Sequence, residues 1–382
     1  MTIVKPKKSL ITYVFGFGRS NLISSNKNYA DEFFYGYFHF KNEFNDVEYI
    51  EFENNVDKKI INRVLLFISK VLRKISKLSF FIENICTFKN FKKLLNTKNI
   101  IITNDRMGLS LLPFLIIYKL FRVNKSSVIV MGLLAKETNN ILSHAIQRTF
   151  LNLFFLTVDR FIFLSKSEWK QAKVSYKKFR NKFYFVPFCI DTDFWKPNEP
   201  NIPRKKIIFI GNDGRREYSL VNEIARELPE YEFTFVTSEI KKDEIKSKNI
   251  SLYEGSWNKQ VLTDYELKDI YSEAKLSIIP IKNSYQPSGQ SVALQSMSMN
   301  VPVMITDTVG FWDKEIFSNN ENIYFIKKNT LNTWVKNIKL VLADNNELNR
   351  VSKKSKKIFE EKYNSKFLYS SLKKIVLNEK EG

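Results

Sequence analysis

The stretch IIFIGNDGRREYSLVNEIAREL, residues 207–228, decides the fold. Four apolar residues lead into a loop with Gly211 and Gly214, and apolar residues at helical spacing follow. A continuous apolar run is typical of a parallel strand that is covered on both faces, and the second part is typical of an amphipathic helix. The stretch therefore predicts one strand–loop–helix unit of a parallel sheet.

The same alternation of apolar runs and helical patterns extends along the whole chain in two series. The first series of expected strands covers residues 9–16, 47–52, 99–104, 126–132, 160–165 and 182–188. The second series covers residues 205–211, 231–237, 250–255, 274–280, 301–306 and 322–326. Helix-like segments separate the strands, which predicts an α/β fold with two Rossmann-like, doubly wound parallel sheets.

A proline-rich break, KPNEPNIPRK at residues 196–205, separates the two series and is typical of a linker. The chain has 382 residues, which is long for one core. We expect an N-terminal domain over 1–197, a C-terminal domain over 198–365, and a helix over 366–382 that packs back on the N-terminal domain. Two such domains would face each other across a cleft, with ligands beyond the carboxyl ends of the strands.

The charge balance indicates an anionic partner. The chain has 61 Lys and Arg against 40 Asp and Glu, which gives a net charge of +21. Nucleic acid, an anionic membrane surface and phosphorylated ligands all fit such an excess. Apolar residues make up 44% of the chain and charged residues 26%, so the composition favours a soluble globular protein.

The sequence offers little for disulfide or metal chemistry. Cys86 and Cys189 lie far apart in apolar contexts, which indicates buried free thiols. His39 and His144 are also scattered, in helix-like contexts, so we expect no metal site. No segment has the pattern of a signal peptide, and the longest apolar runs fall short of the roughly 20 residues that span a bilayer. A cytoplasmic location is therefore expected.

The loop of the opening stretch is a candidate phosphate site. Gly211 and Asn212 begin the loop, and Arg215 and Arg216 stand at the entrance of the helix. Free backbone N–H groups at a helix start bind anions, and a guanidinium fork matches phosphate oxygens. The alternative is a pair of solvated arginines at a helix start.

The first predicted strand ends in a similar loop, FGFGRSN at residues 15–21. Gly16 and Gly18 permit close approach of another backbone, and Arg19 adds a cation. A phosphate loop and a tight strand-to-helix turn both fit this pattern.

A third loop, in YQPSGQSVALQSM at residues 285–297, carries no charged side chain. It follows an expected strand and leads into an expected helix, so its N–H groups would serve a second part of the same ligand. Neutral side chains suit the hydroxyl groups of a sugar or ribose, and they keep carboxylates away from a diphosphate. The candidates here are Ser288, Gly289, Gln290 and Ser291.

Four segments carry a family resemblance. VDRFIFLSKSEWKQ (158–171) has a strand that ends in Ser before a helix, and FYFVPFCIDTDFWKP (183–197) has the pattern that closes a first domain. IIFIGNDGRREY (207–218) matches the first strand and loop of a donor-binding second domain. SGQSVALQSMSMNVPVMITDTVG (288–310) matches a later element of that domain, which consists of a ligand loop, a helix and a Pro-Val strand. Together they resemble glycosyltransferases of the GT-B fold, most like family 4.

The resemblance implies roles for the candidate residues. Arg215 and Arg216 would stabilise the charge on the leaving diphosphate as the catalytic residues. The donor, a nucleoside-diphosphate sugar, would be bound by Gly211, Asn212, Ser288, Gly289, Gln290, Ser291 and Gln295. The acceptor side would include Gly16, Gly18, Arg19 and Glu32, of which Glu32 fits either a catalytic base or a polar helix start. No catalytic metal and no further cofactor are implied.

The sequence departs from the family pattern at several positions. Two Glu separated by seven residues are usual in the 288–310 element, and here these positions hold Pro287 and Gln295. Gln295 still has a donor and an acceptor for ribose hydroxyls. Met131 and Gly132 stand in a loop where many members carry His, and Cys189 stands where Gly is usual.

Residues 60–81, IINRVLLFISKVLRKISKLSFF, predict a basic amphipathic helix. At about 100° per residue, its cations fall on one arc and its branched apolar residues on the opposite one. Such a helix could lie on an anionic bilayer, where each cation near the surface contributes roughly 1 kcal/mol. The alternative is an ordinary packed helix with a solvated basic face. The cations are Arg63, Lys70, Lys74 and Lys77, and the apolar residues are Ile61, Val64, Leu65, Ile68, Val71, Leu72 and Ile75.

Three functions remain open at this point. The resemblance implies a hexosyltransferase-type enzyme, retaining, that acts on a glycan or lipid-linked acceptor in the assembly of bacterial surface polysaccharide such as lipopolysaccharide or capsule. It would be peripheral at the inner face of the plasma membrane. A catalytically silent partner subunit would also fit the missing Glu pair. Nucleic-acid binding would fit the net charge, although no nucleic-acid module is evident.

Overall fold

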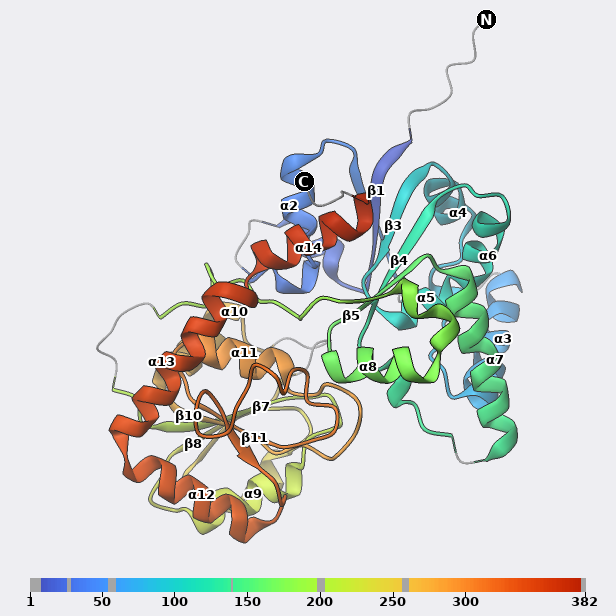
Figure 1. Ribbon diagram of the computed structural model, residues 1–382. Coiled ribbons are helices and arrows are strands. Elements are labelled where there is room, and N and C mark those ends of the chain that lie inside the picture. Colours follow the sequence, from blue (N-terminus) through green and yellow to red (C-terminus); the bar gives the residue numbers. More distant parts are fainter. Residues whose placement is uncertain are drawn as a thin grey trace, which may run out of the picture. The chain divides into compact units, whose positions relative to one another are not determined.

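The computed structural model describes residues 8–25, 29–53, 60–138, 140–197, 203–255 and 261–378. The chain forms two compact units (Figure 1). The first comprises Met1–Lys27, Phe33–Pro187 and Leu368–Gly382, and the second comprises Asn28–Glu32 and Phe188–Phe367. Each unit contains one six-stranded sheet in which all neighbours are parallel, so the predicted α/β class with two doubly wound sheets is confirmed.

The sheet of the first unit has the order β2-β1-β3-β4-β5-β6. Its apolar runs form strands where the sequence predicts them, with ends that differ by a few residues. The bounds are β1 Ser9–Phe15, β2 Val47–Glu51, β3 Thr97–Ile102, β4 Lys125–Val130, β5 Arg160–Phe163 and β6 Phe183–Phe185.

Alternate side chains of β1 show why both faces of this sheet are covered. Val14 belongs to the core that includes Leu151 and Phe154, whereas the Tyr13 ring packs against Tyr37 and Phe40 on the other face. Figure 1 shows α3 and α7 on one side of the sheet and α2 and α14 on the other. The helices are α1 Arg19–Ser24, α2 Tyr37–Glu43, α3 Ile60–Ser76, α4 Phe88–Leu95, α5 Asp105–Ser110, α6 Leu112–Leu120, α7 Ile141–Thr157, α8 Lys166–Ser175 and α14 Ser365–Leu377.

The sheet of the second unit has the order β12-β11-β10-β7-β8-β9, in which strand order reverses between β7 and β10. Its strands again form at the expected runs. The bounds are β7 Lys206–Ile210, β8 Phe233–Val236, β9 Ile250–Tyr253, β10 Ala274–Ile279, β11 Val303–Thr306 and β12 Tyr324–Ile326. A reversal of this kind leaves a crevice at the carboxyl ends of the two central strands, where ligands of doubly wound folds bind.

One face of this second sheet carries a core in which Phe209 and Phe235 pack with Val221 of α9 and Trp334 of α12. Trp334 is fully buried, and its indole N–H donates to the Asn329 side chain at 2.7 Å. The helices are α9 Tyr218–Glu227, α10 Asp264–Glu273, α11 Gln290–Ser298, α12 Leu331–Ala343 and α13 Asn345–Lys362.

The division between the units follows Pro187, ten residues before the end that the sequence suggests. Two contacts explain this difference. The Ile190 N–H donates to the Tyr363 carbonyl at 2.9 Å, and the Trp195 indole donates to Glu32 at 2.9 Å, so this segment packs with the second unit. Residues 198–202 of the expected linker lie outside the described residues.

Among the described residues, no helix is long and apolar enough to cross a membrane, and no disulfide forms. Cys189 is buried and Cys86 is half-buried; burial raises the pKa of the Cys86 thiol to about 12.

Gly310 offers a test of the packing that supports the loop after β10. A Cβ at this position would lie 2.6 Å from the carbonyl carbon of Tyr285, which is backbone and cannot rotate away. Gly310→Ala should therefore lower the free energy of unfolding by about 1–3 kcal/mol. Gly16→Ala is the control, because nothing lies within 4 Å of its Cβ position. Equal stability of the two variants in urea titrations would contradict this packing.

Candidate functional site

The loops after β7 and β10 meet at the carboxyl edge of the second sheet. Arg216 and Ile281 form an isolated antiparallel bridge, and the Lys282 N–H donates to the Arg215 carbonyl at 2.9 Å. The Glu217 N–H donates to the Pro280 carbonyl at 3.0 Å. The two loops that the sequence analysis proposed for one ligand are therefore bonded to each other through their backbones.

Arg216 fills the space between these loops. A Cβ on Gly211 would lie 2.6 Å from its Nε atom, and a Cβ on Gly289 would lie 3.5 Å from its Nη1 atom. The guanidinium is 3% exposed and pairs with Asp213 at 2.9 Å. Its Nε has no hydrogen-bond partner in the described structure. Three residues predicted for the donor site, Gly211, Arg216 and Gly289, are thus brought together around one buried cation.

Asn212 and Arg215, in the loop after β7, differ in their contacts with the rest of the protein. The Asn212 amide donates to the Gly255 carbonyl at 2.6 Å and accepts from the Ser238 N–H at 2.6 Å, so this side chain holds the loop. Arg215 is half-buried, and its guanidinium makes no hydrogen bond or ion pair with the described residues. It is the cation of this loop that is available to a ligand.

The N-terminus of α11 begins at the end of the second loop. Gly289 has φ +79°, a left-handed conformation that side chains rarely adopt, and it precedes the first helical residue, Gln290. The Ser288 hydroxyl is buried and has no hydrogen-bond partner in the described part of the chain. Gln290 is buried and Ser291 is half-buried. The positive end of a helix dipole attracts an anion.

Gln295 lies one turn deeper in α11, in a buried polar network. Its Nε2 donates to Glu32 Oε1 at 2.9 Å, and its Oε1 accepts from the Tyr271 hydroxyl at 3.0 Å. Trp195 Nε1 donates to the same Glu32 oxygen at 2.9 Å. An amide has two N–H protons and two lone pairs, so one of each is used here. The predicted contact of Gln295 with ribose stays a prediction.

Glu32, which the resemblance places on the acceptor side, packs within the second unit in this structure. It is 1% exposed, and burial raises the pKa of its carboxyl to about 7, although the bonds from Gln295 and Trp195 oppose this shift. No pattern in the sequence indicates that Tyr271 joins these residues, because it lies in an ordinary amphipathic helix.

The other acceptor-side candidates form a turn whose helix start is already occupied by a carboxylate. Gly18 has φ +88° and precedes α1. The Ser20 N–H donates to Glu51 Oε1 at 3.0 Å, and the Ser20 hydroxyl donates to the other oxygen of Glu51. Arg19 lies 5.4 Å from the ring centre of Phe34. Nothing lies within 4 Å of a Cβ on Gly16. The tight-turn alternative accounts for this geometry without a ligand.

The loop after β4, where Met131 and Gly132 replace a usual His, is held by two buried carboxylates. Glu168 accepts from the Gly132 N–H at 2.8 Å and from the Leu134 N–H at 3.0 Å. Asp105 accepts from the Met131 N–H at 3.3 Å. Burial raises the pKa of Glu168 to about 7 and that of Asp105 above its ordinary value. The described residues contain no group of three or more His, Cys, Asp or Glu that could hold a metal.

No protein-family model matches the chain, and no curated protein matches its sequence. Solved structures match almost all of it. HepE from Anabaena, in complex with UDP, has a TM-score of 0.68 at 10% identity over 97% of this chain and 100% of HepE. Sucrose-phosphate synthase from Thermosynechococcus elongatus has a TM-score of 0.67 at 12% identity over 97% and 98% of the two chains.

A glycosyltransferase from Rickettsia africae has a TM-score of 0.61 at 12% identity over 98% of this chain and 100% of its own. The shared feature is the fold: two doubly wound parallel sheets, the GT-B architecture of glycosyltransferases. The GT-B fold that the sequence predicts is confirmed, whereas membership of family 4 stays a prediction.

The Glu32 network predicts a distinct pH dependence of stability. The folded protein keeps the Glu32 proton to about pH 7, whereas the unfolded chain loses it near 4.5, so this group makes unfolding easier as the pH rises between these values. The effect is on the order of 3 kcal/mol. Glu32→Gln keeps the oxygen that accepts from Trp195 and Gln295, and it should remove this part of the pH dependence in urea titrations.

Glu223→Gln, at an exposed position of α9, is the matched control and should leave the pH dependence as in the wild type. A Glu32→Gln variant with the wild-type profile would show that the Glu32 carboxyl titrates normally.

Proposed function

We propose that the protein is a glycosyltransferase that moves a sugar from a nucleoside-diphosphate sugar to a glycan or lipid-linked acceptor in the assembly of bacterial surface polysaccharide. One observation carries this proposal. Two loops at the point where strand order reverses are joined around Arg216, and beside it they place the Arg215 guanidinium, which has no partner among the described residues, next to the N-terminus of α11. HepE, which shares the fold, was solved with UDP and with UDP-glucose.

The chemistry follows from these groups. Arg215 and the N–H groups of α11 would bind the diphosphate, and Ser288, Gln290 and Ser291 would meet the hydroxyls of the sugar. When the bond between the anomeric carbon and the diphosphate oxygen breaks, negative charge grows on that oxygen. Fixed N–H donors and a guanidinium stabilise such charge without reorganisation. The buried Arg216 adds a positive field, while its contacts serve to position the loops. Retention of configuration and independence from a metal are carried over from the family resemblance.

Helix α3 supports a peripheral membrane location. Its outward face is apolar: Ile61 is 66% exposed and Phe67 is 67% exposed. Its two fully buried residues, Ser69 and Ser76, are polar, and the Ser69 hydroxyl bonds to Glu83 at 2.5 Å. An ordinary packed helix has the reverse pattern. Lys70 and Lys74 are also exposed and would meet anionic headgroups while the apolar side chains enter the acyl boundary. A lipid-linked acceptor would be reached from this position.

A catalytically silent partner subunit is the second candidate, because Pro287 and Gln295 replace the usual Glu pair. Nucleotide binding without any turnover of nucleotide sugars would favour it. Nucleic-acid binding is the third, and salt-sensitive binding to DNA with no binding to nucleotide sugars would favour it.

Arg215→Ala tests the donor site. A charged hydrogen bond to phosphate contributes about 1.5–3 kcal/mol, so the variant should bind nucleoside diphosphate about ten- to a hundredfold more weakly. The ligand is whichever of UDP, GDP, ADP and CDP stabilises the wild type most in a thermal-shift screen. Arg226→Ala, an exposed arginine of α9, is the matched control and should bind as the wild type does. Equal affinity of both variants would remove Arg215 from the site.

Ile61→Ser with Phe67→Ser tests the membrane role. Both side chains are exposed, so folding stability should change by less than about 0.5 kcal/mol. Binding to vesicles of phosphatidylcholine and phosphatidylglycerol should weaken by roughly tenfold or more, because burial of each side chain contributes about 1.5–3 kcal/mol. Leu340→Ser, 67% exposed on α12, is the control. Vesicle binding that does not change in the double variant would contradict docking through α3.

A further inference from the structure

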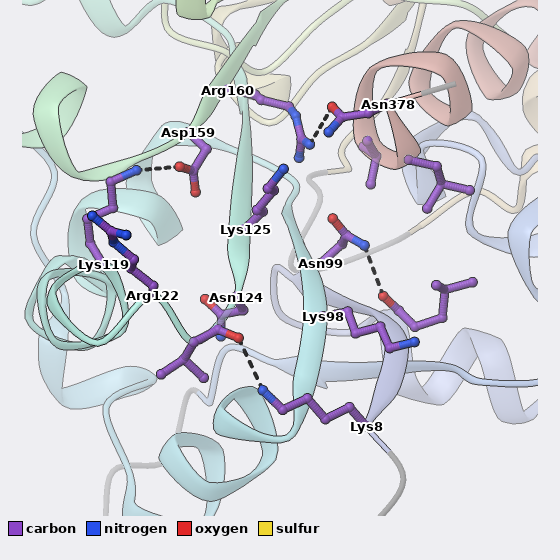
Figure 2. Close-up of a pocket in the computed structure, with 14 residues that line it drawn as sticks. Lys8, Lys98, Asn99, Lys119, Arg122, Asn124, Lys125, Asp159, Arg160 and Asn378 are labelled. Carbon is purple, nitrogen blue, oxygen red and sulfur yellow. Dashed lines mark hydrogen bonds and ion pairs between the residues drawn. The ribbon is translucent and has the colours of Figure 1, made fainter. Parts of the chain in front are cut away.

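A second cationic site lies in the first unit, at the amino ends of its strands. A cavity of about 790 Å³ opens there (Figure 2). Its lining includes six cations and one carboxylate: Lys8, Lys98, Lys119, Arg122, Lys125, Arg160 and Asp159. The loops proposed for the donor follow the carboxyl ends of strands in the other unit, so none of their residues lines this cavity.

The parallel sheet explains why cations that are far apart in the sequence meet here. All amino ends of parallel strands lie at one edge, and Lys98, Lys125 and Arg160 stand in the first two positions of β3, β4 and β5. Figure 2 shows them projecting from neighbouring strands, with Lys119 and Arg122 to one side at the end of α6. The carboxyl end of a helix favours cations, which helps to keep these two in place.

Arg160 is the strongest sign that an anion belongs in this cavity. It is 5% exposed, and its guanidinium bonds only to neutral groups: Asn378 Oδ1 at 2.9 Å and Ser127 Oγ at 3.4 Å. No carboxylate of the described chain pairs with it. Burial of a cation is costly and lowers the pKa of Arg160, although the nearby charge of Asp159 opposes this shift.

The remaining charges of the lining compensate for Arg160 only in part. Asp159 is the carboxylate of the lining, and it pairs with Lys119 and accepts from the Ser126 N–H at 2.9 Å. The side chains of Lys98, Arg122 and Lys125 make no hydrogen bond or ion pair with residues that the structure describes. The cavity therefore offers several cations that repel one another until an anion enters.

The rest of the lining indicates what kind of anion fits. It is made of amide and aliphatic side chains, and no aromatic ring is among the described lining residues: Asn99, Asn124 and Asn378, and Leu10, Val123, Val376 and Leu377. A nucleobase would lack a stacking partner. Several clustered cations suit a compact anion with more than one phosphate group.

We propose that this cavity binds a small soluble anion that carries two or more phosphate groups. The phosphates bridge Arg160 to Lys98 and Lys125 at the strand ends. Val376 and Leu377, the last residues of α14, and Asn378, which follows them, form part of the wall, so the bound anion also fastens the end of that helix to the sheet.

Calorimetry with inorganic tripolyphosphate tests the proposal. The wild type should bind it at one site while UDP is present in excess, and salt should weaken the binding. Lys98→Glu with Lys125→Glu should weaken it by about tenfold or more, since two attractions become repulsions. Both lysines are exposed. Lys246→Glu with Lys248→Glu, an equal charge change at exposed positions of the second unit, is the control and should bind as the wild type does.

Each result decides the question. Loss of tripolyphosphate binding in the Lys98 and Lys125 variant alone, with Arg215→Ala unaffected, supports the proposal even if the donor proposal fails. If the charge-reversed variant does not fold, Lys98→Gln with Lys125→Gln takes its place. In the wild type, hydrogen exchange at the end of α14 should slow when tripolyphosphate binds. The proposal is overturned if the Lys98 and Lys125 variant binds tripolyphosphate as tightly as the Lys246 and Lys248 control does. Binding of cardiolipin vesicles or duplex DNA through these lysines, without tripolyphosphate binding, overturns it in favour of a lipid or nucleic acid.

Discussion

One buried guanidinium organises the proposed donor site. Arg216 occupies the space that a side chain on Gly211 would need, and it is in contact range of Gly289, where a side chain would clash with Ile279 instead. A cation this deeply buried is tolerated because Asp213 pairs with it. That pairing fixes the first loop, and the backbone bond between Lys282 and Arg215 fixes the second loop to the first. Because the two loops are joined, Arg215 of the first loop and the N-terminus of α11 after the second lie at the same edge of the sheet.

The architecture could be predicted from the sequence because each strand has a recognisable local pattern. Runs such as IIFI at 207–210 are apolar without alternation, which is the pattern of a strand covered on both faces. The candidate loops were found for the same reason, since a loop at the carboxyl end of a strand is where a doubly wound fold binds ligands. Local pattern could not separate Arg215 from Arg216. They are the same residue type side by side, and Arg216 is buried where it pairs with Ile281, which is distant in sequence.

Properties that depend on contacts between residues far apart in the chain could not be predicted from the sequence. The periodicity of α3 shows a cationic and an apolar face but does not say which residues turn inward. The buried residues are Ser69, which bonds to Glu83, and Ser76, so cations and apolar side chains are both exposed. The cationic cavity depends on strand ends that are adjacent in space but spread from Lys8 to Arg160 along the chain. Glu32 packs beside Gln295 although 263 positions separate them. Each case is set by sheet topology and not by neighbours in the sequence.

The neutral side chain at position 295 is explained by this last contact. A carboxylate at 295, as the family resemblance would have it, would stand beside the buried Glu32, and two carboxylates at hydrogen-bond distance cannot both ionise. An amide at 295 avoids this conflict, because it donates to Glu32 and accepts from Tyr271 at the same time. The network thus keeps one carboxyl group, contributed by residue 32 instead of by the helix. Gln295 and Glu32 are therefore a coupled pair: the loss of charge at one position is compatible with a buried acid at the other.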